Sequence, residues 1–269
     1  MRLNSSRSYL YIYRTCTSLI FNYLQIILVA LGETPAKTGG TPAPLRSGKS
    51  DFGLQLKHLR QAQPPGLPFA VAFLLNEQFV PAPDDDAIRR WREQLESGEP
   101  MDQQIAAQKL VDLGAEQALL SVLRAKNPVA VQLATSGLWE CWFNEQGTAA
   151  RKIMDQGIAK MEEGELEDAL EIFVRLSRRH PEWAEAHNKR ATVLYLLGNA
   201  RLSYKVCQLV TELKPDHFGA WNGMALCAAH LEKWKAALKA AERALALQPS
   251  AQANVDLIAL AKTKLEEGG

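Results

Sequence analysis

The amino-acid sequence predicts an all-α protein whose C-terminal half is a solenoid of helical hairpins, with a helical extension before it and a capping helix after it. Three observations carry this prediction. Prolines recur at 34-residue intervals, at Pro181, Pro215 and Pro249. Residues of high helix propensity, chiefly Ala, Leu, Glu and Lys, dominate the second half of the chain. Hydrophobic residues make up 47% of the 269 residues, which is enough for a sizeable core.

The first 50 residues are expected to form a targeting segment and a linker. Residues 1–32 contain three arginines, many hydroxyl side chains and no acid, and this composition resembles an organellar transit peptide. We expect a chloroplast location first and a mitochondrial location as the alternative, ahead of a secreted or cytoplasmic one. The apolar run of residues 19–31 would also suit a signal peptide, and a third interpretation is that the segment carries no address. The run is shorter than the roughly 18–20 apolar residues that span a bilayer, so no stable membrane anchor is expected.

Residues 33–50 are rich in Pro, Gly, Ser and Thr, which is typical of a flexible linker. Gly48, Lys49 and Ser50 match the end of a phosphate-binding loop, but Ala43 stands where that motif requires glycine. No nucleotide or other cofactor is therefore expected. The four cysteines lie far apart and form no C-x-x-C pair, so neither a metal site nor a disulfide framework is predicted.

Residues 51–145 are predicted to be a helical extension. Three acids at residues 84–86 favour a helix start, and Asn127 followed by Pro128 suits another. The helices expected there run from Asp84 through Leu95 and over residues 102–113, 115–125 and 128–143. The segment is weakly similar to HEAT-type hairpins, and the alternative is a set of helices that cap the end of the solenoid.

Two further features of this segment are an apolar run of undecided secondary structure and a pair of tryptophans with a packing role. The apolar run of residues 69–75 would suit either a buried strand or a helix, because its length does not decide between them. Trp139 and Trp142 lie three residues apart on one helix face and are interpreted as packing residues.

Residues 146–269 repeat themselves at the period that the three prolines mark. Each unit has a small residue at its eighth and twentieth positions, which lets its two helices approach closely. The predicted units are residues 150–183, 184–217 and 218–251, followed by a capping helix over residues 252–267. Each proline ends the second helix of a unit, and stacking of the units buries the apolar face that a single hairpin leaves open.

Over residues 150–251 this pattern resembles the tetratricopeptide repeat (TPR) family, and residues 184–191 are similar to a bacterial and plastid subgroup of unassigned activity. The resemblance implies a right-handed α-solenoid in which the first helices of successive units line a concave groove. Such grooves commonly receive an extended peptide or a partner helix. Two positions depart from the family pattern, because His187 stands where the family often has Trp and Glu232 replaces the turn glycine of the third unit.

The resemblance assigns a set of candidate partner-binding residues to that groove. Asn188 and Asn222 are 34 residues apart and so occupy matching places on adjacent units, where a carboxamide could pair with a peptide backbone as donor and acceptor. The alternative is that both asparagines hydrogen-bond the turns between units. The other candidates are Met154 and Ile158 from the first unit, Lys189, Thr192 and Tyr195 from the second, and Leu226 from the third.

Several partner and activity classes are not expected. The formal net charge of +1 lacks the basic excess that nucleic acid requires. TPR domains that bind acidic chaperone tails hold the terminal carboxylate with a five-residue clamp, and that clamp is absent here. The corresponding positions hold Met154, Ile158, Lys189, Gly219 and Gly223. No H-E-x-x-H or G-x-S-x-G motif occurs, so no catalytic residue is assigned and the chain is not expected to be an enzyme.

These observations predict a non-enzymatic scaffold or adaptor that binds a protein or peptide in the groove, in organelle biogenesis or complex assembly. Two alternatives stay open. The chain could be a constitutive structural subunit of a larger complex, with the acidic middle segment as a second contact surface. It could also be the regulatory domain of an enzyme, which would require a pocket of titratable groups in residues 51–145.

Overall fold

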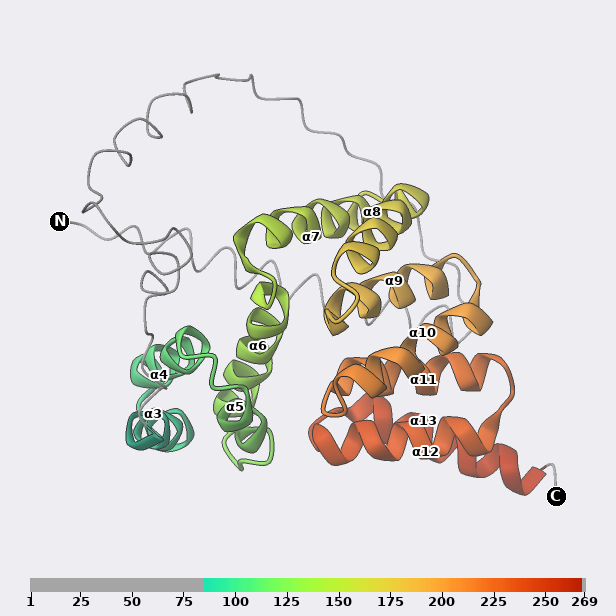
Figure 1. Cartoon of the computed structure of the whole chain (residues 1–269). Helices are drawn as coiled ribbons and strands as arrows, with labels where there is room; N and C mark the ends of the chain where they lie inside the picture. Colours follow the sequence, from blue (N-terminus) through green and yellow to red (C-terminus); the bar gives the residue numbers. More distant parts are fainter. Residues whose placement is uncertain (1–84, 268–269) are drawn as a thin grey trace, which may run out of the picture. The chain divides into compact units, whose positions relative to one another are not determined.

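The computed structural model describes residues 85–267, and every regular element in that range is a helix. The all-α prediction is confirmed for this part of the chain. The predicted targeting segment and linker of residues 1–50 and the apolar run of residues 69–75 lie outside the described residues. None of the described helices, labelled α3 to α13 in Figure 1, is both long and apolar enough to cross a bilayer.

Four helices form the described part of the extension, and their starts follow the signals in the sequence. They are α3 (Asp85–Ser97), α4 (Pro100–Asp112), α5 (Glu116–Val122) and α6 (Pro128–Asn144). Asp85 and Asp86 lie in the first turn of α3, where negative charge complements the helix dipole. Asn127 caps α6, because its Oδ1 accepts hydrogen bonds from the backbone N–H groups of Val129 and Ala130 at 3.0 and 3.3 Å.

Three helical hairpins and a final helix follow, close to the boundaries that the 34-residue period predicts. The hairpins are α7 (Gly147–Glu162) with α8 (Leu166–Arg179), α9 (Ala184–Leu196) with α10 (Ala200–Leu213), and α11 (Phe218–His230) with α12 (Trp234–Leu247). The capping helix α13 (Gln252–Glu267) packs against α12 (Figure 1). Pro181, Pro215 and Pro249 each follow the second helix of a hairpin, which proline cannot continue.

Small residues bring the two helices of each hairpin together, as the repeat pattern predicts. A Cβ atom added at Gly157 of α7 would lie 2.6 Å from the ring of Phe173 in α8, so this position excludes a side chain. In the second hairpin, the hydroxyl of Ser203 donates a hydrogen bond to the backbone oxygen of Ala191 at 2.7 Å. The helices therefore pack at a distance that leaves no room for larger residues at these places.

The turn inside each hairpin requires a left-handed backbone at one residue. Gly164 and Gly198 have a φ of 80° there, and Glu232 has a φ of 56° at the matching place of the third hairpin. Glycine adopts this conformation without steric cost, whereas an L side chain is strained in it. The departure from the family pattern at Glu232 is therefore a strained position.

Replacing Glu232 with glycine is expected to raise the free energy of unfolding by about 0.5–1 kcal/mol, because the strain of the side chain is removed while the backbone stays as it is. Urea denaturation at neutral pH measures the change. Glu163→Gly is the matched control, since Glu163 has a φ of −74° at the end of α7 and glycine there should destabilise the fold. A loss of stability in both variants would contradict the assignment of strain to Glu232.

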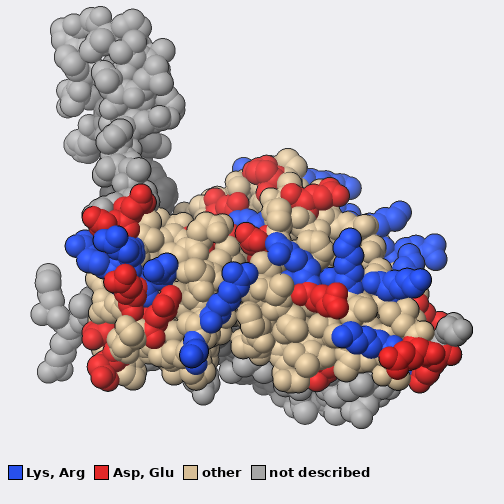
Figure 2. All heavy atoms as spheres, turned by 90° about the horizontal axis from the view of Figure 1, so that it is seen from below, with Lys and Arg blue, Asp and Glu red and all other residues tan. Residues whose placement is uncertain are grey.

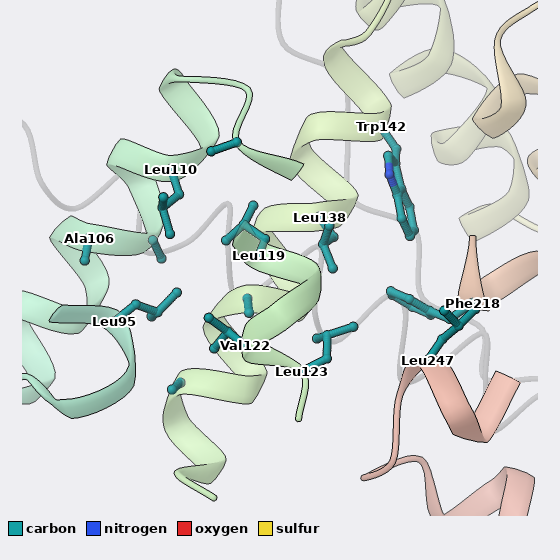
Figure 3. Packing of buried hydrophobic residues seen from close by; sticks show 14 residues of the cluster. Leu95, Ala106, Leu110, Leu119, Val122, Leu123, Leu138, Trp142, Phe218 and Leu247 are labelled. Carbon is teal, nitrogen blue, oxygen red and sulfur yellow. The ribbon is translucent and has the colours of Figure 1, made fainter. Parts of the chain in front are cut away.

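The extension and the repeats share one hydrophobic core, shown in Figure 3. Trp142 of α6, Phe218 of α11 and Leu247 of α12 belong to the same cluster as the leucines of α3 to α5. The labelled members are Leu95, Ala106, Leu110, Leu119, Val122, Leu123, Leu138, Trp142, Phe218 and Leu247. Phe218 is the first residue of α11 and Leu247 is the last residue of α12. Because both belong to the cluster that contains Trp142, α6 lies along the edge of the stack where one hairpin ends and the next begins. The extension is thus not confined to the end of the solenoid.

Candidate functional site

A pocket opens between α9 and α11, the first helices of the second and third hairpins. The volume of the pocket that is open to the centres of water-sized molecules is about 80 Å³. Six of the eight predicted groove residues line it, namely Asn188, Lys189, Thr192, Tyr195, Asn222 and Leu226. The structure therefore brings together the candidates from the second and third units.

Met154 and Ile158 do not line this pocket. Met154 is fully buried in a cluster with Phe173 and Trp183, so its side chain offers no free surface to a partner in this structure. Ile158 packs against the same cluster and is only partly buried. Phe143, near the end of α6, is a member of that cluster too. The extension thus helps to cover residues of α7 that the repeat pattern alone assigned to an open groove.

The two asparagines occupy matching places but have different partners. The Nδ2 of Asn188 donates a hydrogen bond to Oε2 of Glu185 at 3.0 Å, so this amide is partly committed to the protein. The Asn222 side chain has no hydrogen-bond partner within residues 85–267, although the residue lines the pocket and is only 6% exposed. Neither amide bonds a turn between units, which was the alternative. Asn222 can satisfy its amide only with water or with a ligand that enters the pocket.

The hydroxyl of Tyr195 is a second buried polar group that lines the pocket and has no hydrogen-bond partner in the described range. Burial, with a smaller contribution from Cys227, raises the pKa of Tyr195 to about 12. The hydroxyl therefore keeps its proton at neutral pH and can donate to a ligand. The exposed ring of His230 stands edge-on to Tyr195, with 5.9 Å between the ring centroids.

Behind Asn188 and Lys189 lies a buried charge network centred on Glu185. The side chains of Glu185 and His217 are fully buried, and Oε2 of the acid is 2.9 Å from Nε2 of the imidazole. The backbone N–H of Ala220 donates to Nδ1 of His217 at 3.1 Å. That nitrogen therefore carries no proton, and Nε2 donates to the carboxylate. Lys189 completes the network, with its Nζ 3.4 Å from Oε1 of Glu185.

The carboxylate and the ammonium of this network neutralise each other. Burial would raise the pKa of Glu185, but the charge of Lys189 and the hydrogen bonds from His217 and Asn188 lower this pKa below its ordinary value. Glu185 is therefore ionised at neutral pH. Lys189 also lies over the rings of Trp139 and Phe143, with Nζ 5.4 and 5.1 Å from their centroids. The ammonium group at the pocket is thus paired and held in place.

Trp139 of α6 supplies an aromatic wall of the pocket. Its ring stands edge-on to His217 and Phe218, with centroid separations of 5.6 and 5.3 Å. A Cβ atom added at Gly219 would lie 2.6 Å from the Trp139 ring, so glycine permits this close approach. The neighbouring Trp142 stacks on His217 at 4.2 Å. Both tryptophans pack, as predicted, but the role of Trp139 at the pocket was missed because α6 lies outside the repeat period.

The floor of the pocket comes from α10 and α11. Ser203, Cys207 and Cys227 line it, and the Sγ of Cys227 donates to the Oγ of Ser203 at 3.1 Å. Because the Ser203 hydroxyl is itself bonded to Ala191, the floor presents polar groups that already have partners. Sequence reasoning could have found the floor from the small residue at the twentieth position of the unit, which faces the first helix.

Two other observations bear on the classes of ligand. On the face shown in Figure 2, basic and acidic side chains are interspersed, unlike the continuous basic surface that nucleic acid favours. Within residues 85–267, no group of three or more His, Cys, Asp or Glu side chains is arranged to hold a metal ion. Cys141, Cys207 and Cys227 are free thiols.

The residues of the hairpins are similar to known protein sequences. Residues 154–203 and 208–252 match a family model described as tetratricopeptide repeat. A TPR repeat-containing protein of Rhizobium etli is 33% identical over 121 residues, which are 44% of this chain. The match spans 59% of the length of that relative.

Solved structures with a similar arrangement of helices include two TPR domains. The Sgt2 TPR domain from Aspergillus fumigatus is 20% identical, with 45% of this chain and 81% of that chain covered and a TM-score of 0.43. The TPR2B domain of yeast Sti1, in complex with pHsp70, is 19% identical, with 43% and 97% covered and a TM-score of 0.42.

Proposed function

This chain is a tetratricopeptide repeat protein, and we propose that it is a non-enzymatic adaptor that binds an extended peptide or a partner helix in the groove between α9 and α11. Tetratricopeptide repeats generally serve as interaction modules, which supports a protein or peptide as the partner. The proposed residues are those that line the pocket, with Asn222 as the principal one and Asn188, Lys189, Thr192, Tyr195 and Leu226 around it.

The observation that carries this proposal is the unpartnered carboxamide of Asn222. This amide lines the pocket, where water can bond it, and a bound group that fits the amide would replace that water with a net gain of about 0.5–1.5 kcal/mol per hydrogen bond. A carboxamide presents a donor and an acceptor side by side, which matches the C=O and N–H groups of a peptide backbone. The pocket therefore suits a ligand that offers amide groups.

The polar groups on α9 are spaced for an extended chain. Asn188 and Tyr195 are two helical turns apart, which is about 10.5 Å along the axis. Three residues of an extended peptide span about the same length. A segment that lies along α9 could thus accept a hydrogen bond from the Tyr195 hydroxyl at one end and meet the asparagines at the other.

Replacing Asn222 with alanine is expected to weaken peptide binding about tenfold, because one bond of about 1–1.5 kcal/mol to the ligand is lost. The free energy of unfolding should change little, since the Asn222 amide lines the pocket and bonds no other described residue. The ligand for this test is a peptide selected on the wild-type chain from a random library. Fluorescence anisotropy measures its affinity, and urea denaturation measures stability.

Asn188→Ala is the matched control, because it removes the amide that already bonds Glu185. This variant should lose about 1–3 kcal/mol of stability, as the bond to a buried carboxylate is broken. If Asn222→Ala bound the peptide as tightly as the wild type, the groove would not be the binding site. A stability loss equal to that of Asn188→Ala would instead assign Asn222 a structural role.

We also propose that the protein is imported into an organelle and has a role there in organelle biogenesis or complex assembly. The basic, acid-free composition of residues 1–32 supports import into an organelle, the chloroplast first. A fluorescent protein fused behind residues 1–50 should enter that organelle in plant cells, and a diffuse cytoplasmic signal would contradict the proposal.

A further inference from the structure

We propose that the pocket between α9 and α11 receives one uncharged aliphatic side chain of the bound peptide, of the size of valine, leucine or methionine. This inference rests on the proposed function and adds the specificity of the groove. It follows from three properties of the pocket, which are its charge, its lining and its size.

The charge balance of the pocket disfavours an ionised occupant. Lys189 lines the pocket, but its ammonium is 3.4 Å from the carboxylate of Glu185, which is fully buried. The same carboxylate accepts hydrogen bonds from His217 and Asn188 at Oε2, while its Oε1 faces the ammonium of Lys189, so Lys189 is the counter-charge of a fully buried acid. An acidic or basic side chain that entered would lose its hydration without gaining an unpaired counter-charge.

The lining of the pocket favours an apolar side chain. Leu226 and the indole of Trp139 form apolar walls, and the small residues Ala191 and Gly223 leave space between them. The Ser203 hydroxyl on the floor donates a hydrogen bond to Ala191 and accepts one from Cys227, so its proton is not free to bond a ligand. Asn222 and the hydroxyl of Tyr195 have no partner among the described residues and can bond a polar group of a ligand that enters. Apolar walls with a few polar groups among them are the arrangement that seats one side chain of an extended peptide.

The size of the pocket selects among apolar side chains. The 80 Å³ open to the centres of water-sized molecules corresponds to about five waters, at roughly 15 Å³ each. The side chains of leucine and methionine have four non-hydrogen atoms and that of valine has three, so each could replace these waters. An aromatic side chain would have to displace Leu226 or Trp139. Release of water from the apolar walls would then favour the aliphatic occupant.

A peptide series tests the inference. A random twelve-residue peptide library is first selected on the full chain, and the position enriched among the binders is then varied to Ala, Val, Leu, Met, Phe, Glu and Lys. On the wild type, the leucine, valine or methionine peptide should bind about tenfold tighter than the alanine peptide. The Glu and Lys peptides should bind at least tenfold more weakly than the best aliphatic one.

Leu226→Ala enlarges the pocket and should shift the preference toward the phenylalanine peptide. Leu209→Ala is the control, because Leu209 is an exposed leucine of α10 outside the pocket, and it should leave the order unchanged. Melting curves show that both variants are folded. A preference for a charged residue, or an unchanged order in Leu226→Ala, would overturn the inference alone, provided that binding still depends on Asn222. If the wild type bound none of the peptides, the proposed function would fall as well.

Discussion

Replacing Glu185 with alanine is expected to lower the free energy of unfolding by about 3–5 kcal/mol at pH 7, because the change leaves Lys189 and His217 buried without their common partner. The side chains of Glu185 and His217 are fully buried, and that of Lys189 is nearly so. An ammonium group without a counter-charge in this position would have to move toward water or lose its proton. Either response would disturb the stacking of Trp139 and Trp142 around the network.

Glu185→Gln separates the charge from the shape of this side chain. Glutamine can still accept the hydrogen bond from Nε2 of His217, but it cannot neutralise Lys189. The native fold lowers the pKa of Glu185, so ionisation of this group stabilises the protein at neutral pH. That contribution is lost as the pH falls from the ordinary carboxyl value of about 4.3 toward the lower value of the folded state. The stability difference between the wild type and Glu185→Gln should therefore shrink in acid.

Urea denaturation of both proteins at pH 7 and at successively lower pH measures this difference. Glu163→Gln is a suitable control, because Glu163 is exposed at the end of α7 and its ion pair with Lys160 should contribute little. A stability difference for Glu185→Gln that did not change with pH would mean that the charge of Glu185 is not what stabilises the network.

Trp183→Ala is expected to cost about 3–5 kcal/mol, since it removes a fully buried aromatic side chain from the junction between α6 and α9. The indole Nε1–H donates to the backbone oxygen of Trp142 at 2.7 Å. That oxygen is one of the last four carbonyls of α6, which have no partner within their own helix. Trp183 thus caps the extension helix from the repeats, and its loss should loosen the wall of the pocket that Trp139 forms.

Trp183→Phe tests the hydrogen bond with most of the apolar ring retained. It should cost about 1–2 kcal/mol, because the carbonyl of Trp142 stays buried without its donor. Thermal and urea denaturation give the stabilities, and peptide affinity gives the effect on the pocket. Leu209→Ala, at an exposed position of α10, should change neither quantity. If Trp183→Ala melted like the wild type, α6 would not be anchored through this contact.

The hairpins could be predicted from the sequence because their determinants are local. Pro181 and Pro215 end helices by the chemistry of proline itself, and Gly164 and Gly198 supply the left-handed turns. The matching places of Asn188 and Asn222 follow from the same period. The strained backbone at Glu232 can also be predicted from this pattern. Glu232 stands where the other units have glycine, and any residue at that place has to adopt the left-handed turn.

The division of roles within the groove could not be predicted in this way. Asn188 and Asn222 are equivalent by period, yet only Asn188 has Glu185 one helical turn before it on the same helix, whereas Gly219 stands at the matching place before Asn222. The tertiary structure adds His217 to this carboxylate from the neighbouring hairpin. Met154 was assigned to the groove by position, but it lies in the cluster that includes Phe143 of α6.

The sequence by itself thus determined the helices, their pairing into hairpins and the helix faces that meet the groove, because a fixed period repeats the same local interactions. Only the tertiary structure decided which of those faces remain open, where Trp139 closes the pocket and which asparagine is left without a partner. The physical reason is that α6 lies outside the repeat. Its contacts with α9, α11 and α12 depend on how particular side chains fit together across the chain, and no period in the sequence encodes that fit.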